Sequence, residues 1–434
     1  MTVIEPVVSA YDPTNLRSVL DRASLAALGF VALLSGACGS SELPSLETSD
    51  GEITADSSGS DVAVSEELEA EEAETEPATT VTTMPSGPGF DFSEAKLIVE
   101  EFVAAKNLNG AALTIVHRDH GIISETFFGI YDKDRISLIA SSSKMVSAGV
   151  LLALHDQGLL DIDKPIADFV SWGSGNPEIT TAQLLSNSSG LIGLFQDLTY
   201  PPYLCIWNHT STLEECAEQV MMTTEDDGLV IAPDTSFNYG GAQWQVAGGV
   251  AEAVSGKSWA QLVDEMLIQP CGLEVFGFNN PFSQLPNAGF EHPAAFQSNP
   301  EQFEDTDNPN IGGGAYSNSR DYAALLLMHL QDGMCGDNRV LSSNALDRLH
   351  EDRIGEVYDG NAYSDGSGYA MGWWVDRASG RLTGTGAYGS SPWLDLKDGY
   401  GVHLLTESSS ATSNELAALL FDVIDQSVAR GIDG

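Results

Sequence analysis

The spacing of hydrophobic residues changes along the chain from a pattern typical of strands to one typical of helices, and then back. Residues 111–116 and 122–128 are rich in β-branched and apolar side chains, and the turn residues 119–121 between them complete a predicted β-hairpin. Apolar residues at helical spacing follow over 141–154, and Gly158 marks the end of that predicted helix.

The middle of the chain is predominantly helical by the same criterion. Apolar residues recur at helical spacing in five further segments, which are 181–185, 213–222, 244–254, 259–268 and 319–330. Strand patterns return before a final predicted helix, in the order 371–375, 392–396, 401–406 and then the helix 414–428. Strands at both ends with helices between them indicate one α+β domain, with a sheet built from both chain ends and a mainly helical insert. We expect an active site where the sheet and the insert meet.

The N-terminal region has the pattern of an export signal. Two arginines precede a short apolar stretch, 23–34, which is followed by Ser35 Gly36 Ala37 Cys38 and is too short to predict a transmembrane helix. The end resembles a bacterial lipoprotein lipobox, although its leucine stands one residue early and Ser35 takes its place. We therefore expect residues 1–37 to be a signal segment and Cys38 to be lipidated, giving an exported cell-envelope lipoprotein tethered to the membrane. Simple signal cleavage and an uncleaved anchor are the alternatives.

Residues 38–89 differ in composition from the rest of the chain. They are rich in Ser, Thr, Glu and Pro, contain no Lys or Arg, and include the acidic run 66–72. Such a segment buries too little apolar surface to offset the entropy of ordering, so it predicts a disordered, self-repelling tether before a domain over 90–434. The formal net charge of −45 and the lack of a basic patch disfavour nucleic-acid binding and indicate a solvated acidic coat.

Four of the five cysteines fall in the predicted domain, at Cys205, Cys216, Cys271 and Cys335. Four cysteines in an exported domain allow three disulfide pairings. A Cys205 to Cys216 bond would close one loop, and Cys271 with Cys335 would then join distant segments; free buried thiols are the alternative. None of the cysteines has the spacing of a zinc site and no HExxH occurs, so we expect neither a metal nor a cofactor.

Ser141 and Lys144 form the most informative pair in the chain. Residues three apart share one face of a helix, so the Lys144 amine can reach the Ser141 hydroxyl. A lysine whose pKa is lowered by burial or by a nearby cation can take the serine proton and make a nucleophile without a histidine. The unpaired N–H groups at the helix start lie where an oxyanion would develop during acyl transfer.

The same spacing occurs at Ser93 and Lys96, where it predicts structure instead of chemistry. Ser93 stands before apolar residues at helical spacing and has Glu94 behind it, so we expect it to be a helix N-cap.

Further segments follow the Ser141 helix in a recognisable order. They are a nucleophile-helix region over 139–170, a loop over 179–191 with Asn187 where histidine is common, a tyrosine region over 233–241, and a glycine-rich stretch over 312–317. Together these segments resemble the serine β-lactamase and penicillin-binding-protein superfamily, specifically its class C and esterase-like branch, over nearly everything after residue 93. The resemblance implies a β-lactamase-like fold with an antiparallel sheet.

The resemblance also implies roles for individual residues. By position, Ser141 would be the acylated nucleophile, Lys144 its proton partner and Tyr239 a second basic or proton-relaying group. A tyrosine in that role needs neighbouring cations to lower its pKa, so we expect Lys144 to act on Tyr239 as well.

The chain departs from the family pattern at two places. The asparagine that usually follows the tyrosine by two residues is replaced by Gly241, and Gln243 is the candidate substitute as a substrate contact. The third motif falls on Gly384 Thr385 Gly386 without its usual cation, which argues against tight binding of penicillin-like anions.

The third-motif segment has two interpretations from sequence. On one, a glycine-flanked strand lets the substrate approach closely, and the Ala387 N–H completes an oxyanion hole with that of Ser141. On the other, residues 384–389 are simply a tight turn into the strand 392–396. Trp373 and Trp374, close by in sequence, are expected to be strand and core residues.

Together these observations predict a serine hydrolase that acts through an acyl-enzyme on small-molecule esters or amides lacking an essential carboxylate. A D-alanyl-D-alanine carboxypeptidase or a β-lactamase is the alternative within enzymes. An alternative of another class is a catalytically inactive cell-envelope binding protein, since two of the three motifs are incomplete.

Overall fold

The computed structural model describes residues 82–83, 89–222, 227–285 and 292–433. The predicted signal segment, Cys38 and the tether as far as residue 81 lie outside these residues. Within the described part of the chain, no helix is both long and apolar enough to cross a membrane.

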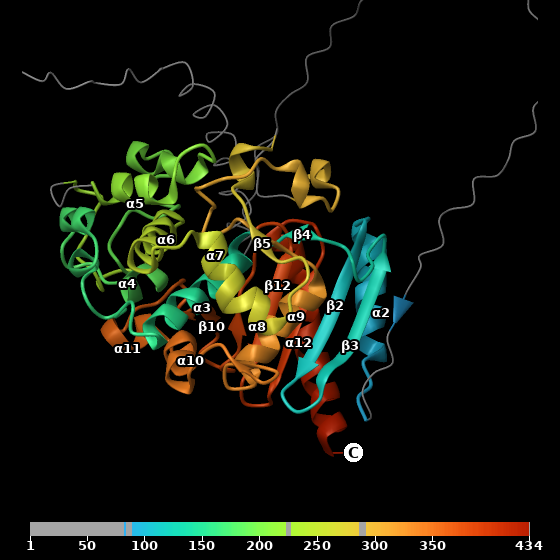
Figure 1. The fold of residues 1–434 in the computed structure, drawn as a ribbon. Helices are drawn as coiled ribbons and strands as arrows, with labels where there is room; N and C mark the ends of the chain where they lie inside the picture. Colours follow the sequence, from blue (N-terminus) through green and yellow to red (C-terminus); the bar gives the residue numbers. More distant parts are fainter. Residues whose placement is uncertain (1–81, 84–88, 223–226, 286–291, 434) are drawn as a thin grey trace, which may run out of the picture.

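An antiparallel sheet of eight strands forms the centre of the fold (Figure 1). Its strands lie in the order β1 (Thr82–Thr83), β3 (Gly121–Gly129), β2 (Gly110–His117), β13 (Tyr400–Leu405), β12 (Ser390–Asp395), β11 (Leu382–Thr383), β10 (Trp374–Val375) and β9 (Gly368–Tyr369). The predicted hairpin is confirmed as β2 and β3, and the pairing of β2 with β13 joins the two ends of the chain in one sheet, as predicted.

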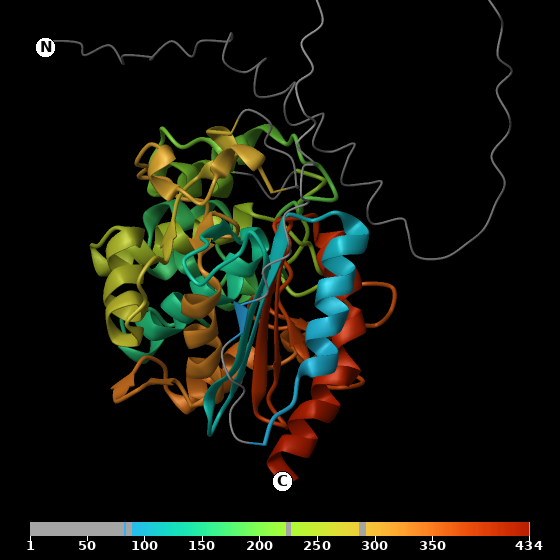
Figure 2. The same ribbon diagram turned by 90° about the vertical axis from the view of Figure 1, so that its right-hand side faces the viewer.

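Helices cover both faces of the sheet. On one face, α2 (Ser93–Lys106) and α12 (Ser410–Asp433) lie side by side, as Figure 2 shows, over a core of apolar residues from β2, β3, β12 and β13. On the other face, α9 (Ser319–Leu330) packs against β2 and β13, and α3 (Ser143–Asp156) lies deeper in the larger core. Residues 145–154 of α3 are all buried, so this helix is fixed on every side.

The insert between the chain ends is mainly helical, as predicted. Its helices are α4 (Thr181–Leu185), α5 (Leu213–Met221), α6 (Ala242–Ser255), α7 (Trp259–Val263), a π-helical turn (Asp264–Ile268), α8 (Gln269–Cys271), α9, α10 (Ser343–His350) and α11 (Arg353–Tyr358). Short strands accompany them as β4 (Ser137–Leu138), β6 (Ala315–Ser317) and β5 (Gly277–Phe278) in one small sheet, and β7 (Met334–Cys335) with β8 (Asn338–Arg339) in another.

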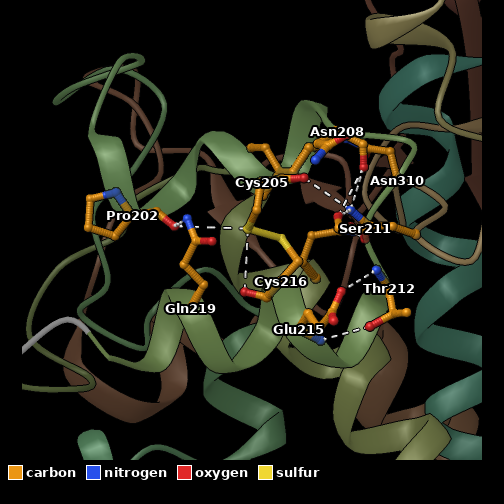
Figure 3. Close-up of a disulfide and its surroundings, with 12 residues drawn as sticks. Pro202, Cys205, Asn208, Ser211, Thr212, Glu215, Cys216, Gln219 and Asn310 are labelled. Atoms are coloured by element: carbon orange, nitrogen blue, oxygen red, sulfur yellow. Dashed lines mark hydrogen bonds between the residues drawn. A yellow bond between two sulfur atoms is a disulfide. The ribbon is translucent and has the colours of Figure 1, made fainter. Parts of the chain in front are cut away.

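Two disulfides are present, one local and one between distant segments. Cys205, in the 3₁₀ segment Pro201–Trp207, is bonded to Cys216 in α5, whose first turn is closed by a capping box of Thr212 and Glu215 (Figure 3). Cys271 at the end of α8 is bonded to Cys335 in β7. The structure therefore selects one of the three pairings that the sequence left open.

Ser93 is not the N-cap that its sequence context predicts. It is the first residue of α2, and both its N–H and its hydroxyl donate to the carboxylate of Asp91, at 2.9 and 2.6 Å. The carboxylate two residues upstream is a stronger acceptor than a hydroxyl, so the serine becomes the donor. Ser93 and Lys96 nevertheless belong to a surface helix, as the structural interpretation required.

Candidate active site

The nucleophile candidate lies on a short, strained turn between the sheet and α3. Ser141 is the middle residue of a 3₁₀ turn (Ala140–Ser142), so it precedes α3 instead of opening it. Ala140 has φ of +44°, a left-handed conformation that costs a residue with a side chain free energy and that often marks functional sites. The Ser142 hydroxyl donates to the carbonyl oxygen of Gly384 at 2.6 Å and thereby fixes the turn to the β11 segment.

Lys144 lies one turn from Ser141 and is almost completely buried. Its amine is 3.1 Å from the Ser141 hydroxyl and donates to the carbonyl oxygen of Gly312 at 2.6 Å. Because water cannot solvate the ammonium form there, burial lowers the pKa of Lys144 to about 7. An amine at this position is partly neutral at physiological pH and can accept a proton.

Tyr239 completes the group. Its ring lies under the Lys144 amine, 4.7 Å from centroid to nitrogen, and its hydroxyl interacts with the Ser141 side chain. Burial raises the pKa of Tyr239 to about 12, and the contact with Ser141 opposes this only in part. The expectation that cations lower the pKa of this tyrosine is therefore wrong, since desolvation is the dominant effect on it. Tyr239 is a neutral proton donor in this environment.

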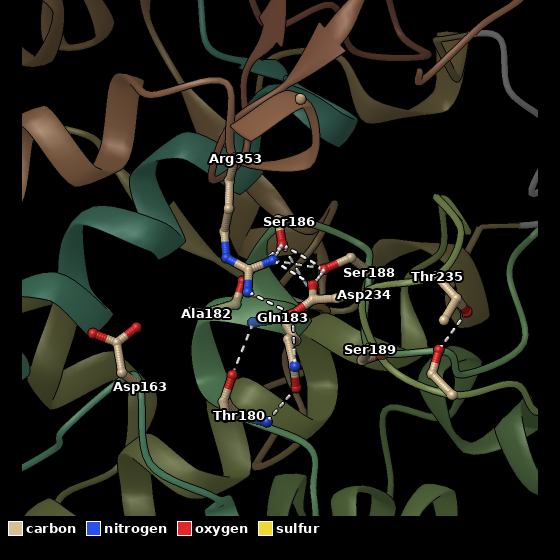
Figure 4. Close-up of polar contacts among 12 residues, drawn as sticks. Asp163, Thr180, Ala182, Gln183, Ser186, Ser188, Ser189, Asp234, Thr235 and Arg353 are labelled. Atoms are coloured by element: carbon tan, nitrogen blue, oxygen red, sulfur yellow. Dashed lines mark hydrogen bonds and ion pairs between the residues drawn. The ribbon is translucent and has the colours of Figure 1, made fainter. Parts of the chain in front are cut away.

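A partly buried ionic cluster holds the loop that carries Tyr239. The Arg353 guanidinium, at the start of α11, donates to both carboxylate oxygens of Asp234 at 2.7 and 3.0 Å, and to the hydroxyls of Ser186 and Ser188 (Figure 4). Gln183 adds a further hydrogen bond to Asp234 at 2.8 Å. The cluster connects α4, the tyrosine loop and α11, and so fixes the direction from which Tyr239 approaches the nucleophile.

Gln243 does not take the place of the missing asparagine. Its side chain is fully buried, accepts from the Ser189 hydroxyl at 2.5 Å and donates to the carbonyl oxygen of Asn238 at 2.6 Å. Asn187, at the position where the family often has histidine, accepts from the Gly240 N–H at 3.1 Å. The prediction that Gln243 contacts a substrate is wrong. The first turn of α6, which carries Gln243, faces the protein interior, and the hydrogen bond from Gln243 to Asn238 holds the loop that carries Tyr239.

The third-motif segment lies beside the nucleophile turn and continues the sheet. The N–H groups of Gly384 and Gly386 donate to the carbonyl oxygens of Pro392 and Ser390, so both the strand and the turn interpretations hold in part. A Cβ at Gly386 would lie 2.0 Å from the carbonyl oxygen of Ile139, which explains the glycine.

The oxyanion hole predicted around this segment remains a prediction. Ala387 and Thr385 line the same cleft as Ser141, whereas Gly384 and Gly386 are buried and do not line it. The Ala387 N–H has no backbone acceptor among the described residues, so it is available to an oxyanion.

Ser141 opens into a cleft of about 380 Å³ with aromatic walls. Four rings stack in sequence across it: Phe195 on Tyr239, Tyr239 on Trp374 and Trp374 on Tyr363, with centroid distances of 6.2, 5.2 and 4.6 Å. Trp373 is a core residue as expected, but Trp374 is only half-buried and forms a wall of the cleft. Strand alternation predicts that one of two adjacent residues faces outward, but it does not show which of the two tryptophans does so.

The charge of the cleft matches the loss of the third-motif cation. No Lys, Arg or His occurs among the described residues that line it; its charged residues are Asp365 and Asp376. The cleft therefore has no side-chain cation with which to bind a substrate carboxylate.

Comparison with known proteins agrees with this geometry. The profile of the family described as β-lactamase matches residues 95–423. Penicillin-binding protein 4 of Amycolatopsis lactamdurans is 26% identical over 71% of this chain and 79% of its own length, and esterase EstB of Burkholderia gladioli is 24% identical over 75% and 93%. The crystal structure of a family VIII carboxylesterase superposes with a TM-score of 0.60 and 17% identity, over 78% of this chain and 99% of that one, and so shares the fold. With the family profile covering most of the described domain, this chain belongs to the β-lactamase family.

Proposed function

We propose that this protein is a serine hydrolase that cleaves small esters or amides lacking an essential carboxylate, through an acyl-enzyme on Ser141. The observation that carries the proposal is the contact of a half-buried serine with a buried lysine of pKa about 7 and with a neutral tyrosine, at the base of an open cleft. This arrangement has a nucleophile, a base and an acid within contact of one another.

The chemistry follows from the protonation states. The neutral Lys144 amine takes the Ser141 proton while the serine oxygen bonds to the substrate carbonyl carbon, and the carbonyl oxygen becomes an oxyanion. The N–H groups of Ser141 and Ala387 are the proposed donors to that oxygen. Collapse breaks the bond to the leaving group, which receives a proton from Tyr239; the tyrosine regains one from the Lys144 ammonium. Water then attacks the acyl carbonyl carbon and gives a proton to the neutral Lys144 amine. Collapse breaks the bond between the acyl carbon and the Ser141 oxygen, which takes that proton from Lys144 as the acid leaves.

The substrate preference rests on charge. A penicillin or a D-alanyl-D-alanine peptide carries a carboxylate, which the family binds with the cation of the third motif. Gly384 supplies no cation, and no described residue of the cleft replaces it. The relatives named as an esterase and a carboxylesterase support the ester preference. The relative named as a penicillin-binding protein keeps a D-alanyl-D-alanine peptidase or a β-lactamase as the second candidate.

Labelling with a fluorophosphonate, followed by peptide mass spectrometry, tests the nucleophile. We expect the label on the peptide that contains Ser141, and its loss in Ser141→Ala. Ser93→Ala is the matched control, because it removes a serine with the same spacing to a lysine from the surface of α2 and should leave labelling unchanged. A folded wild type without label would favour the inactive binding protein over the hydrolase.

A comparison of substrates tests the preference separately. We expect short p-nitrophenyl esters to be hydrolysed with a higher kcat/KM than nitrocefin or a D-alanyl-D-alanine peptide. Faster turnover of nitrocefin than of the esters would establish the second candidate in place of the first.

The proposed setting is the cell envelope. The export pattern over 1–37 supports secretion, and the two disulfides are consistent with an oxidising compartment. The lipobox-like sequence supports an acylated Cys38 as a membrane anchor. Mass spectrometry of the mature N-terminal peptide tests this; a peptide that begins at Cys38 without added acyl mass would contradict the anchor.

A further inference from the structure

The outer part of the active-site cleft carries a concentrated negative charge. Asp365 precedes β9 and Asp376 follows β10, and both line the cleft on the side of Trp374. Hydrogen bonds from Ser367 hold the pKa of Asp365 below its usual value, and those from Ser379 and Ala378 do the same for Asp376. Both carboxylates are therefore ionised at neutral pH. They are also close enough that Asp376 repels the charge on Asp365.

The nearby arginines are already engaged elsewhere. The Arg377 guanidinium donates to the Asp352 carboxylate at 2.5 Å and to the side chain of Asn361. Arg381 donates with one nitrogen to both carboxylate oxygens of Asp425, at 2.9 and 2.7 Å, and is almost fully buried. Arg381 attracts the charge on Asp376 from outside the cleft, but neither arginine lines the cleft, so neither offers its guanidinium to a ligand there.

Aromatic faces complete the environment. Tyr363 forms the outer end of the four-ring stack and remains 41% exposed, so one face of its ring is available to a ligand. The negative face of an aromatic ring attracts a cation, and an adjacent carboxylate strengthens that attraction. A neutral apolar group would gain binding free energy from contact with the rings alone, and the two carboxylates would still repel each other. An anionic group would be repelled by both.

We propose that the cleft selects substrates that carry an alkylammonium or quaternary ammonium group on the ester or amide, with the cation bound between Tyr363, Asp365 and Asp376. This inference rests on the proposed function, since it names the substrate class for the reaction at Ser141. The proposed function requires only that the substrate lack an essential carboxylate, whereas this inference adds that the cleft attracts a positively charged group.

Pairs of substrates with one shape and different charge test the inference. For a cation on the alcohol, butyrylcholine is compared with 3,3-dimethylbutyl butyrate; for a cation on the acyl group, the p-nitrophenyl ester of 4-trimethylammoniobutyrate is compared with that of 5,5-dimethylhexanoate. In at least one pair we expect kcat/KM of the cationic member to be higher by about tenfold or more at low salt, mainly through KM. The ratio should fall as the salt rises to about 0.5 M, because partly exposed charges are screened.

Single substitutions separate the cleft from the acidic surface as a whole. Asp365→Asn and Asp376→Asn should each lower the ratio of cationic to neutral kcat/KM by about threefold or more, because each removes an attraction that acts on the cationic ester and not on the neutral one. Asp398→Asn is the matched control, because it removes the same charge from the exposed turn between β12 and β13 and should not change the ratio. An equal loss in the control would attribute the preference to the overall charge and overturn the inference.

The outcomes distinguish this inference from the proposed function. Equal kcat/KM for both members of both pairs, with the neutral esters hydrolysed, overturns the cation preference and leaves the hydrolase intact. If no ester is hydrolysed, calorimetric titration of full-length Ser141→Ala with butyrylcholine and with 3,3-dimethylbutyl butyrate still measures the binding preference. Tighter binding of butyrylcholine that is lost in Ser141→Ala with Asp365→Asn would support the cation site; equal binding would refute it.

Discussion

The burial of Lys144 predicts how acylation depends on pH. With a pKa of about 7, about nine-tenths of the amine is neutral at pH 8; with the ordinary value of 10.5, about 0.3% would be. Burial thus raises the population of the active base by about 300-fold at that pH. Because kcat/KM reports the ionisation of the free enzyme, it should rise by about tenfold per pH unit below pH 6.5 and level off above pH 8.

The assay is the initial rate of hydrolysis of a neutral p-nitrophenyl ester between about pH 5.5 and 9, with the rate of Ser141→Ala subtracted at each pH. Burial also raises the pKa of Glu252 to about 7, so this carboxyl titrates in the same range. Glu252 lies in a different pocket, against α7, and accepts from the Trp259 N–H. Glu252→Gln is therefore the matched control and should leave the midpoint unchanged.

Three results would refute the reasoning. A flat profile would mean that no base titrates in this range, and a kcat/KM that still rises about tenfold per pH unit at pH 9 would mean that the lysine retains its ordinary pKa. A midpoint that moves in Glu252→Gln would assign the titration to a carboxyl remote from Ser141. The buried histidines cannot imitate Lys144, because burial lowers the pKa of His292 and His350 to about 4.

Three further predictions follow from the contacts around the site. Lys144→Met should abolish turnover yet raise the free energy of unfolding at pH 6, as measured by urea denaturation. Between about pH 7 and 10.5 the unfolded wild type binds the lysine proton and the native state does not, so the stability of the wild type rises with pH. The stability that the substitution gains should therefore shrink over that range. Gly386→Val should lower kcat at least about 100-fold, since its Cβ would lie 2.0 Å from a carbonyl oxygen of the nucleophile turn; unchanged kcat in a folded variant would exclude that role. Arg353→Met should cost about 3 kcal/mol in urea denaturation, because it leaves the largely buried Asp234 carboxylate without its charged partner, whereas a loss below about 1 kcal/mol would show that water replaces the arginine.

Most of the long elements could be predicted from the sequence because their burial is periodic. The hairpin of β2 and β3 and the helices α5, α6 and α9 lie within a few residues of their predicted bounds. Short elements could not be predicted as well. The pattern over 371–375 yields a strand of only two residues, β10, because Gly372 has φ of +91° and packs against the backbone of Lys144.

The pairing of Ser141 with Lys144 could be predicted from the sequence, but the contacts of the residues around them could not. Ser141 and Lys144 are three residues apart, so local helical geometry brings them together. Tyr239 required the resemblance, since its position depends on a loop held by Arg353 from another element. The orientation of Gln243 and the left-handed Ala140 depend on tertiary packing, which no local pattern encodes. A pKa depends on burial for the same reason, so the expected lowering for Tyr239 had the wrong sign.

The missing cation at Gly384 gains its meaning from the cleft around it. Sequence alone shows only that a lysine is absent there, and another cation from elsewhere in the fold could have replaced it. Within the described lining of the cleft, the charged residues are two carboxylates. A side chain at position 384 would also lie 3.3 Å from the Pro392 ring and 3.4 Å from that of Trp373, so Gly384→Lys alone would have to displace packed neighbours. Charge and packing thus act in the same direction, and restoring anion recognition would require changes at several positions of the cleft.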